Sequence, residues 1–171
     1  MKKRAINTIL IAMLFFTLIP VRADAYVLNS YPFPSSMKDE IYNYVDGGLS
    51  SICGSVDTYS KKWNGLSGIK IISTSSSSYA SITQSYSSES NGTYAVTYHR
   101  SSSRKEIVYY KDFKDASNSI RYETIVHEVG HTLGLAHTQS SNDSISVMRA
   151  TGFNGKAYPL SDDKEGINAI Y

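Results

Sequence analysis

The stretch HEVGHTLGLAH, residues His127–His137, decides both the fold and the chemistry of this chain. Residues four apart on a helix lie on one face, one turn along, so His127 and His131 can direct a nitrogen to the same ion. A third ligand needs a change of chain direction. Gly134 permits a left-handed backbone turn there, which brings His137 back to the ion.

A helix is expected to carry the first part of this stretch. Apolar residues recur at helical spacing from Ile120 to Leu133. Asn118 and Ser119 are both good N-cap residues, so we expect the helix to begin near one of them. Gly134 is where it should stop.

The pattern H-E-x-x-H-x-x-G-x-x-H predicts one catalytic zinc ion. Three neutral imidazoles, from His127, His131 and His137, leave a fourth tetrahedral position for water, as in catalytic zinc sites. Glu128 follows the first ligand and can reach that water without binding the metal, which indicates a general base. It would take the proton as the activated water attacks a peptide carbonyl, then deliver it to the departing amine. Because three of the four histidines fall within eleven residues, a chance match is disfavoured.

The residues before this helix predict a sheet and one further long helix. Apolar spacing over 49–63 indicates an amphipathic helix, and Cys53 lies on its apolar stripe, which favours a core residue over a reactive thiol. With a single cysteine, no intramolecular disulfide can form. Alternation and short apolar runs predict strands over 40–46, 69–72, 94–98 and 106–110.

The N-terminus has the features of a secretory signal peptide. Three basic residues precede the apolar run Ile9–Ile19, and Ala23-Asp24-Ala25 supplies a cleavage site. We therefore expect a signal peptide over 1–25, an extended lead-in over 26–39 and a catalytic domain over 40–171. Residues 1–25 hold four of the 17 basic and one of the 15 acidic residues, so the rest carries a formal charge of −1. This balance favours neither nucleic acid nor an anionic membrane as a partner.

The motif resembles the zinc signature of the metzincin metalloproteases, and within them the matrixins. Thr138 after the third histidine and the tail 160–171 are similar to the matrixin pattern, and the similarity runs from about Glu40 to Tyr171. The resemblance implies an α+β catalytic domain with a twisted mixed β-sheet, two long helices and a short C-terminal helix. It also implies that Met148 forms an apolar floor under the histidines, and that Asp162 and Asp163 brace this Met-turn and the N-terminal region.

Four departures from the family pattern bear on function. Ala150 stands where astacin-like and serralysin-like metzincins have a tyrosine near the metal, and 150–153 replaces the Pro-x-Tyr that walls the main specificity pocket of matrixins. His99 is the only spare histidine, so a second, structural zinc is not expected and His99 is interpreted as a surface or packing residue. No inhibitory pro-segment is recognisable, which predicts an enzyme secreted active or held by a separate inhibitor. Calcium at loop oxygens such as Asp112 and Asp115 stays open.

Together these features predict a secreted zinc endopeptidase, acting as a monomer on a protein or peptide substrate. The peptide would lie extended along a sheet edge near 94–98. Two alternatives remain: a secreted zinc-binding interaction module without catalysis, and a zinc amidase acting on cell-wall peptides. Retention of Glu128 argues against the first, because a structural site needs no general base.

Overall fold

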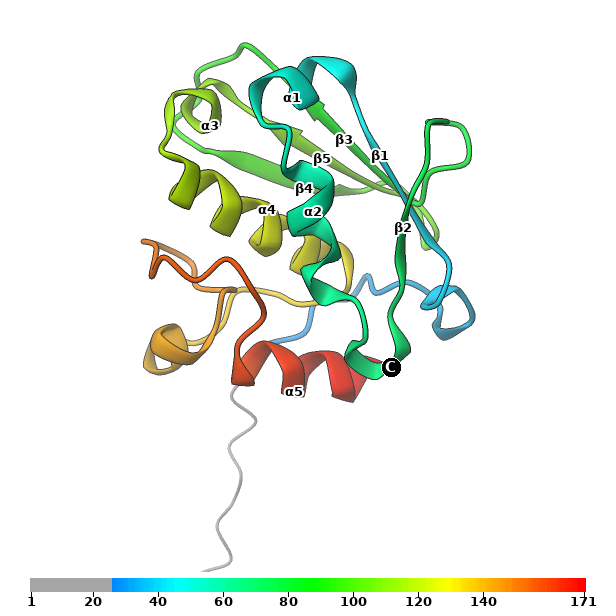
Figure 1. Cartoon of the computed structure of the whole chain (residues 1–171). Coiled ribbons are helices and arrows are strands. Elements are labelled where there is room, and N and C mark those ends of the chain that lie inside the picture. Colours follow the sequence, from blue (N-terminus) through cyan, green and yellow to red (C-terminus); the bar gives the residue numbers. More distant parts are fainter. Residues whose placement is uncertain (1–25) are drawn as a thin grey trace, which may run out of the picture.

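A computed structural model describes residues 26–171, so the expected signal peptide lies outside the described residues. Its centre is a five-stranded mixed sheet in the order β2-β1-β3-β5-β4 (Figure 1). Four strands are parallel, and β4 runs antiparallel to β5 at one edge. The bounds are β1 Ile41–Val45, β2 Ile71–Ser73, β3 Ile82–Tyr86, β4 Ala95–His99 and β5 Lys105–Tyr109. The predicted α+β fold with a mixed sheet is confirmed.

The helices α2 and α4 pack against each other and cover one face of the sheet (Figure 1). The α-helices are α1 Gly47–Ile52, α2 Val56–Ser60, α3 Lys111–Asp115, α4 Asn118–Thr132 and α5 Ser161–Ile170. Short 3-10 turns join them: η1 Ser35–Met37, η2 Lys61–Trp63, η3 Leu66–Gly68 and η4 Ser140–Ile145. The C-terminal helix α5 lies below the sheet and completes the expected closing segment.

The prediction of one continuous helix over 49–63 is wrong. Helix α1 ends at Cys53, whose φ of −145° and ψ of 93° are extended, and α2 starts only at Val56. Glycine at Gly54, next to this break, disfavours continuation of the helix. The apolar stripe still faces the core in both halves, as the burial of Leu49 and Trp63 shows. The described chain therefore contains one long helix, α4, instead of two.

Helix α4 has well-formed ends. Its N-cap is Ser117, whose hydroxyl accepts the Ile120 N–H, so the expected cap at Asn118 or Ser119 is wrong by one or two residues. At the other end Gly134 adopts a φ of 109°, the positive value that the sequence predicted. The Leu135 N–H donates to the Gly130 carbonyl at 3.1 Å, which closes a Schellman-type end and reverses the chain.

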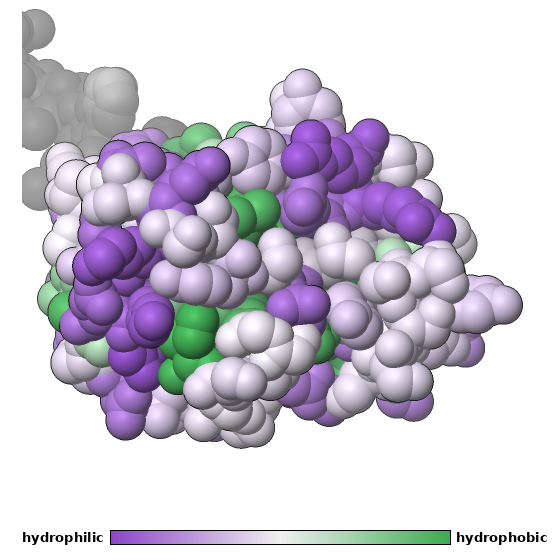
Figure 2. Space-filling view, turned by 90° about the horizontal axis from the view of Figure 1, so that it is seen from above, coloured by the Kyte–Doolittle hydropathy of each residue, from purple (hydrophilic) through white to green (hydrophobic). Residues whose placement is uncertain are grey.

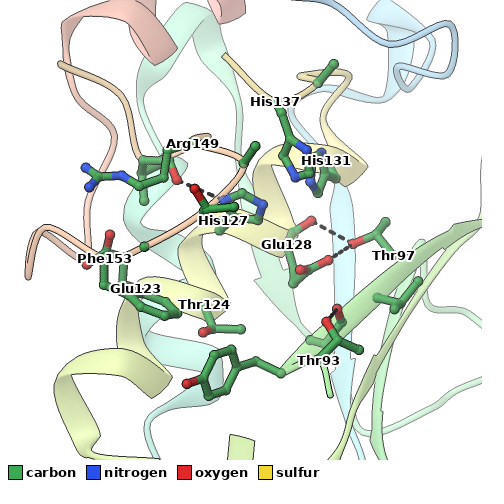
Figure 3. A pocket seen from close by; sticks show the side chains of 18 of the residues that line it. Thr93, Thr97, Glu123, Thr124, His127, Glu128, His131, His137, Arg149 and Phe153 are labelled. Atoms are coloured by element: carbon green, nitrogen blue, oxygen red, sulfur yellow. Dashed lines mark hydrogen bonds between the residues drawn. The ribbon is translucent and has the colours of Figure 1, made fainter. Parts of the chain in front are cut away.

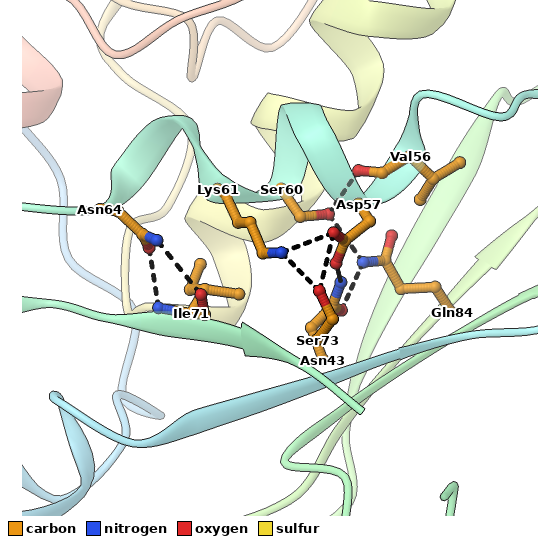
Figure 4. Close-up of polar contacts among 9 residues, drawn as sticks. All are labelled: Asn43, Val56, Asp57, Ser60, Lys61, Asn64, Ile71, Ser73 and Gln84. Carbon is orange, nitrogen blue, oxygen red and sulfur yellow. Dashed lines mark hydrogen bonds and ion pairs between the residues drawn. The ribbon is translucent and has the colours of Figure 1, made fainter. Parts of the chain in front are cut away.

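A buried polar network joins α2 to the sheet (Figure 4). Gln84 on β3 donates to Asn43 Oδ1 at 2.7 Å and to Ser60 Oγ at 2.8 Å, and its own Oε1 accepts from Tyr109 at 2.8 Å. Asn43 in turn donates to Asp57 at 3.2 Å. Because Gln84 takes an inward-facing position on β3, the strand lacks the apolar alternation that marks the others.

One face of the molecule is mostly polar. Figure 2 shows a face on which hydrophilic and neutral side chains dominate, with apolar ones only in small recessed areas. Single exposed apolar residues of this kind are ordinary in globular proteins. No helix in the described part of the chain is long and apolar enough to cross a membrane.

Candidate metal centre

The structure brings His127, His131 and His137 together. The first two come from successive turns of α4, and the third follows the reversal at Gly134. One nitrogen of each ring lies within 4.8 Å of the others, and the ring centroids are 4.7 to 5.2 Å apart. In the described residues this is the only group of three or more metal-binding side chains that could hold one ion.

The hydrogen bonds of the rings suit metal binding. His127 Nδ1 lies 2.8 Å from the Val147 carbonyl, and His131 Nδ1 lies 2.8 Å from the Leu135 carbonyl. Donation from Nδ1 to these carbonyls leaves each Nε2 with a free lone pair. Burial lowers the pKa of His127 and of His131 to about 4, so both rings are neutral at pH 7. This donor set, two neutral imidazoles oriented by carbonyls and the nearby ring of His137, fits zinc.

Glu128 lies beside the cluster without joining it (Figure 3). Its side chain is 7% exposed, and burial raises the pKa of its carboxyl group, an effect that His131 and the Thr97 hydrogen bond oppose. Thr97 Oγ1, on the edge strand β4, lies 2.6 Å from Glu128 Oε2. A carboxyl group of raised proton affinity is well suited to accept and return a proton. Thr97 orients it, a role that the sequence analysis missed.

Met148 lies directly under the histidine-bearing helix. The residue is buried, and an added Cβ at Gly130 would come within 2.4 Å of its sulfur and within 2.9 Å of the Trp63 ring. Glycine in the middle of the zinc motif is therefore required for this close approach. The burial of Met148 against Gly130 agrees with the apolar floor that the family resemblance implied.

The two aspartates of α5 hold the Met-turn. Asp163 accepts hydrogen bonds from the hydroxyl of Ser146 and the N–H of Val147, and Asp162 accepts from Thr138 Oγ1 at 2.6 Å. Both aspartates also border a small cavity shared with Tyr26 and Val27. These contacts agree with the bracing role that the family resemblance implied.

A cavity of about 750 Å³ opens over the histidines. One wall is the edge strand with the residues before it, from 92 to 97, and the opposite wall is the loop after the Met-turn, from 149 to 153. The Phe153 ring meets the Tyr94 ring edge-on with centroids 5.3 Å apart, so the two walls touch at one end. The cleft expected between sheet edge and metal centre is present.

The loop after the Met-turn is held by a residue that the sequence analysis also missed. Glu123 on α4 is 2% exposed and lines the cavity. Its carboxylate accepts the N–H of Asn154 at 2.9 Å and of Gly155 at 2.7 Å. The sequence does contain a signal for Glu123: it is an acidic residue four positions before His127 and therefore lies on the same face of the helix.

The remaining expected residues do not belong to the histidine cluster. His99 at the end of β4 stacks on Tyr31 with centroids 4.9 Å apart, a packing role as expected, and it also lines the cavity. Asp112 and Asp115 lie on α3, where Asp115 pairs with Lys111, and neither belongs to a metal-binding group among the described residues. Cys53 is buried in the core, as expected.

Comparison with known proteins identifies the family. Residues 65–171 match the matrixin family of M10 peptidases. A protein of Spodoptera frugiperda ascovirus 1a, described as a matrix metalloproteinase, is 46% identical over 52 residues, which are 28% of this chain and 13% of that protein. The chain thus spans only a small part of this curated relative.

Solved structures share the fold. A structure of myroilysin superposes with a TM-score of 0.61 over 85% of this chain and 98% of that one, at 16% identity. The GM1-bound form of the ECX AB5 holotoxin contains a chain that superposes with a TM-score of 0.60 over 86% of this chain and 88% of that one, at 13% identity. The match of 65–171, together with the zinc motif and the Met-turn that it contains, shows that this chain belongs to the matrixins, a family of zinc metalloendopeptidases.

Proposed function

We propose that this chain is a secreted zinc endopeptidase that hydrolyses peptide bonds with Glu128 as its general base. The observation that carries the proposal is the position of Glu128: a buried carboxyl group beside three metal-competent histidines, facing a cleft with an edge strand on its far side. Family membership supports the same reaction.

Each residue of the site has a distinct task. His127, His131 and His137 hold the ion, and the carbonyls of Val147 and Leu135 keep two of the rings oriented. Zinc, when bound, supplies Lewis acidity, which polarises a carbonyl and lowers the pKa of a water molecule.

Glu128 handles the proton. It takes the proton from the attacking water and passes it to the departing amine nitrogen. Thr97 holds the carboxyl group in place through its hydroxyl. The rings of Tyr94 and Phe153 meet at one end of the cleft and bound the space that a substrate can occupy.

The substrate is proposed to lie along β4. This strand pairs with β5 on one side only, so its other side can offer main-chain N–H and C=O groups to an extended peptide. Main-chain recognition of this kind selects peptides and unfolded segments over compact proteins. The preference for particular substrate side chains would then be determined by the shape of the cavity.

The two alternatives predict other behaviour. An interaction module would bind zinc and a partner but cleave nothing. An amidase for cell-wall peptides would cleave branched or D-residue-containing peptides in preference to ordinary ones. The position of Glu128 favours a catalytic role over the module, because its carboxyl group faces the cavity beside the three histidines and a purely structural site needs no general base there.

The test compares purified 26–171 with its Glu128→Ala variant on unfolded protein, an L-peptide library and cell-wall peptides, with and without a chelator. We expect the wild type to cleave L-peptides, to lose this activity in chelator and to regain it with zinc. Glu128→Ala should bind zinc equally and be inactive. Cleavage that persists in Glu128→Ala would remove the assigned base, and an inactive wild type with bound zinc would support the module.

Secretion and a monomeric state are also proposed. Secretion rests on the signal-peptide pattern of residues 1–25, and the monomeric state on the hydrophilic and neutral side chains that dominate the face shown in Figure 2. Expression of the whole chain in a secreting host should release a product that begins at Tyr26, read by mass spectrometry. Analytical ultracentrifugation of that product should give a single species of monomer mass.

A further inference from the structure

We infer that Glu123 is a specificity-positioning residue, an inference that rests on the proposed peptidase function. Its carboxylate fixes the loop after the Met-turn and so sets the shape of the side-chain subsite beside His127. The carboxylate lies 2.9 Å from the N–H nitrogen of Asn154 and 2.7 Å from that of Gly155.

The position of Glu123 makes this effect local. It stands one helical turn before His127, and both residues line the same cavity. The loop residues that it holds continue directly from Gly152 and Phe153, which form the opposite wall. Movement of the loop would therefore change the width of the subsite next to the metal while leaving the histidines in place.

Besides the contact of the Phe153 ring with Tyr94, the loop backbone is easily rearranged. Gly152 and Gly155 have φ values of 75° and 72°, conformations that glycine adopts freely and that leave the loop many alternatives when it is released. The loop also lacks the Pro-x-Tyr of typical matrixins, in which proline would restrict the backbone. Here two charge-assisted hydrogen bonds, donated by the N–H groups of Asn154 and Gly155 to a buried carboxylate, replace that restriction.

Nothing cationic competes for Glu123. No ion pair involving it is present in the described part of the chain, and its carboxylate bonds only to main-chain N–H groups there. Arg149 lines the same cavity, but its guanidinium donates to the carbonyl of Asp143 at 2.7 Å and extends away from His127 (Figure 3). The main chain of the loop at Asn154 and Gly155 is thus the hydrogen-bond partner of the buried Glu123 carboxylate.

The measurement is selectivity at each substrate position flanking the cleaved bond, as kcat/KM for peptides that carry Gly, Leu, Phe or Lys there. We expect Glu123→Ala to flatten the preference at one position by about tenfold, mainly through KM, and to leave the other positions unchanged. Glu123→Gln, which keeps one acceptor oxygen, should restore much of the preference. Glu165→Gln, at an exposed acid of α5, is the matched control and should resemble the wild type.

Two further measurements do not depend on turnover. Amide hydrogen exchange at Asn154 and Gly155 should accelerate in Glu123→Ala and only slightly in Glu123→Gln. The zinc-loaded Glu128→Ala variant should bind the same peptides with the side-chain preference of the wild type. The double variant Glu128→Ala/Glu123→Ala should bind them with a weaker preference.

The outcomes separate the two proposals. If peptides are cleaved but Glu123→Ala changes no preference, or changes all positions equally, the inference about Glu123 is overturned and the peptidase stands. If nothing is cleaved but selective binding is lost on Glu123→Ala, the inference stands and the peptidase does not. Absence of both cleavage and selective binding would overturn both.

Discussion

Asp163 and His127 are linked through a single residue. The N–H of Val147 donates to Asp163 Oδ2 at 2.9 Å, and the carbonyl of the same residue lies 2.8 Å from His127 Nδ1. An acid on the C-terminal helix thereby fixes the Met-turn and, through it, the orientation of a metal-binding ring. Burial raises the pKa of Asp163 against the opposing effect of these hydrogen bonds.

Asp163→Asn should weaken zinc binding without touching a ligand. The amide keeps one acceptor oxygen and introduces a donor, so one of the bonds to Ser146, Val147 or Leu160 is lost. Loss of such outer contacts typically costs about 10- to 100-fold in metal affinity. Competition with a fluorescent chelator measures this loss. Glu165→Gln, an exposed change on the same helix, should leave the affinity unchanged; equal affinities for both variants would separate Asp163 from the metal centre.

Gly130→Ala should destabilise the fold. Its Cβ would overlap the sulfur of Met148 at 2.4 Å and the ring of Trp63 at 2.9 Å, and the buried indole cannot move aside easily. We expect a loss of about 1 to 3 kcal/mol in the free energy of unfolding, as for other overpacked cores. Urea denaturation measures it. Gly47→Ala is the matched control, because its Cβ would meet nothing within 4 Å; a similar loss there would refute the packing argument.

Helix α4 and the metal centre could be predicted because they depend on local spacing. Three histidines and a glycine at set intervals specify one helix, one turn and one ion, whatever the rest of the chain does. The broken helix at Cys53 could not be predicted the same way. The apolar stripe from Leu49 to Trp63 is compatible with one helix or with two halves that face the same core.

Strand β3 escaped prediction because a polar residue takes a core position. Gln84 is fully buried and satisfied by Asn43, Ser60 and Tyr109, partners that are distant in sequence. Thr97 and Glu123 were missed for a related reason. Each acts through a tertiary contact, to Glu128 and to the loop at Asn154. The spacing of Glu123 from His127 indicates a shared helix face, but it does not indicate the partner.

Gln84→Ala should lower the free energy of unfolding, because it removes the centre of this buried network. Asn43, Ser60 and Tyr109 would each lose a buried partner at once. Unsatisfied buried groups cost about 1 to 3 kcal/mol each, and some will relax, so we expect about 3 kcal/mol in total. Thermal and urea unfolding test this value. The exposed Gln139→Ala should change stability by less than about 0.5 kcal/mol.

Thr97→Val should lower kcat and leave zinc content and KM nearly unchanged. The variant keeps the shape of the side chain and removes the hydroxyl that donates to Glu128 at 2.6 Å. A base that is free to rotate is less often in position, so we expect a decrease of about 5- to 30-fold in kcat. Thr97→Ser keeps the hydroxyl and should retain most of the activity. If the valine and serine variants have the same kcat, the hydroxyl does not orient Glu128.

Acid should destabilise the metal-free protein between about pH 6.5 and pH 4. In the folded state burial holds the pKa of His127 and His131 at about 4, whereas in the unfolded state both titrate near 6.5. Below pH 6.5 the unfolded state therefore binds more protons, and the free energy of unfolding falls as the pH falls. Two such groups give at most about 3 kcal/mol per pH unit. Glu128 and Asp163, whose pKa values are raised, act in the opposite direction and reduce the net slope.

Urea denaturation in chelator at pH 7, 6 and 5 measures this slope, and His131→Gln isolates the histidine part. This variant should be less sensitive to pH than the wild type by about 1 kcal/mol per pH unit, because one buried base no longer titrates. Zinc should extend stability to lower pH, since the ion binds the neutral rings and competes with protons. An unchanged slope in His131→Gln would mean that burial does not lower the pKa of His131 in the folded state.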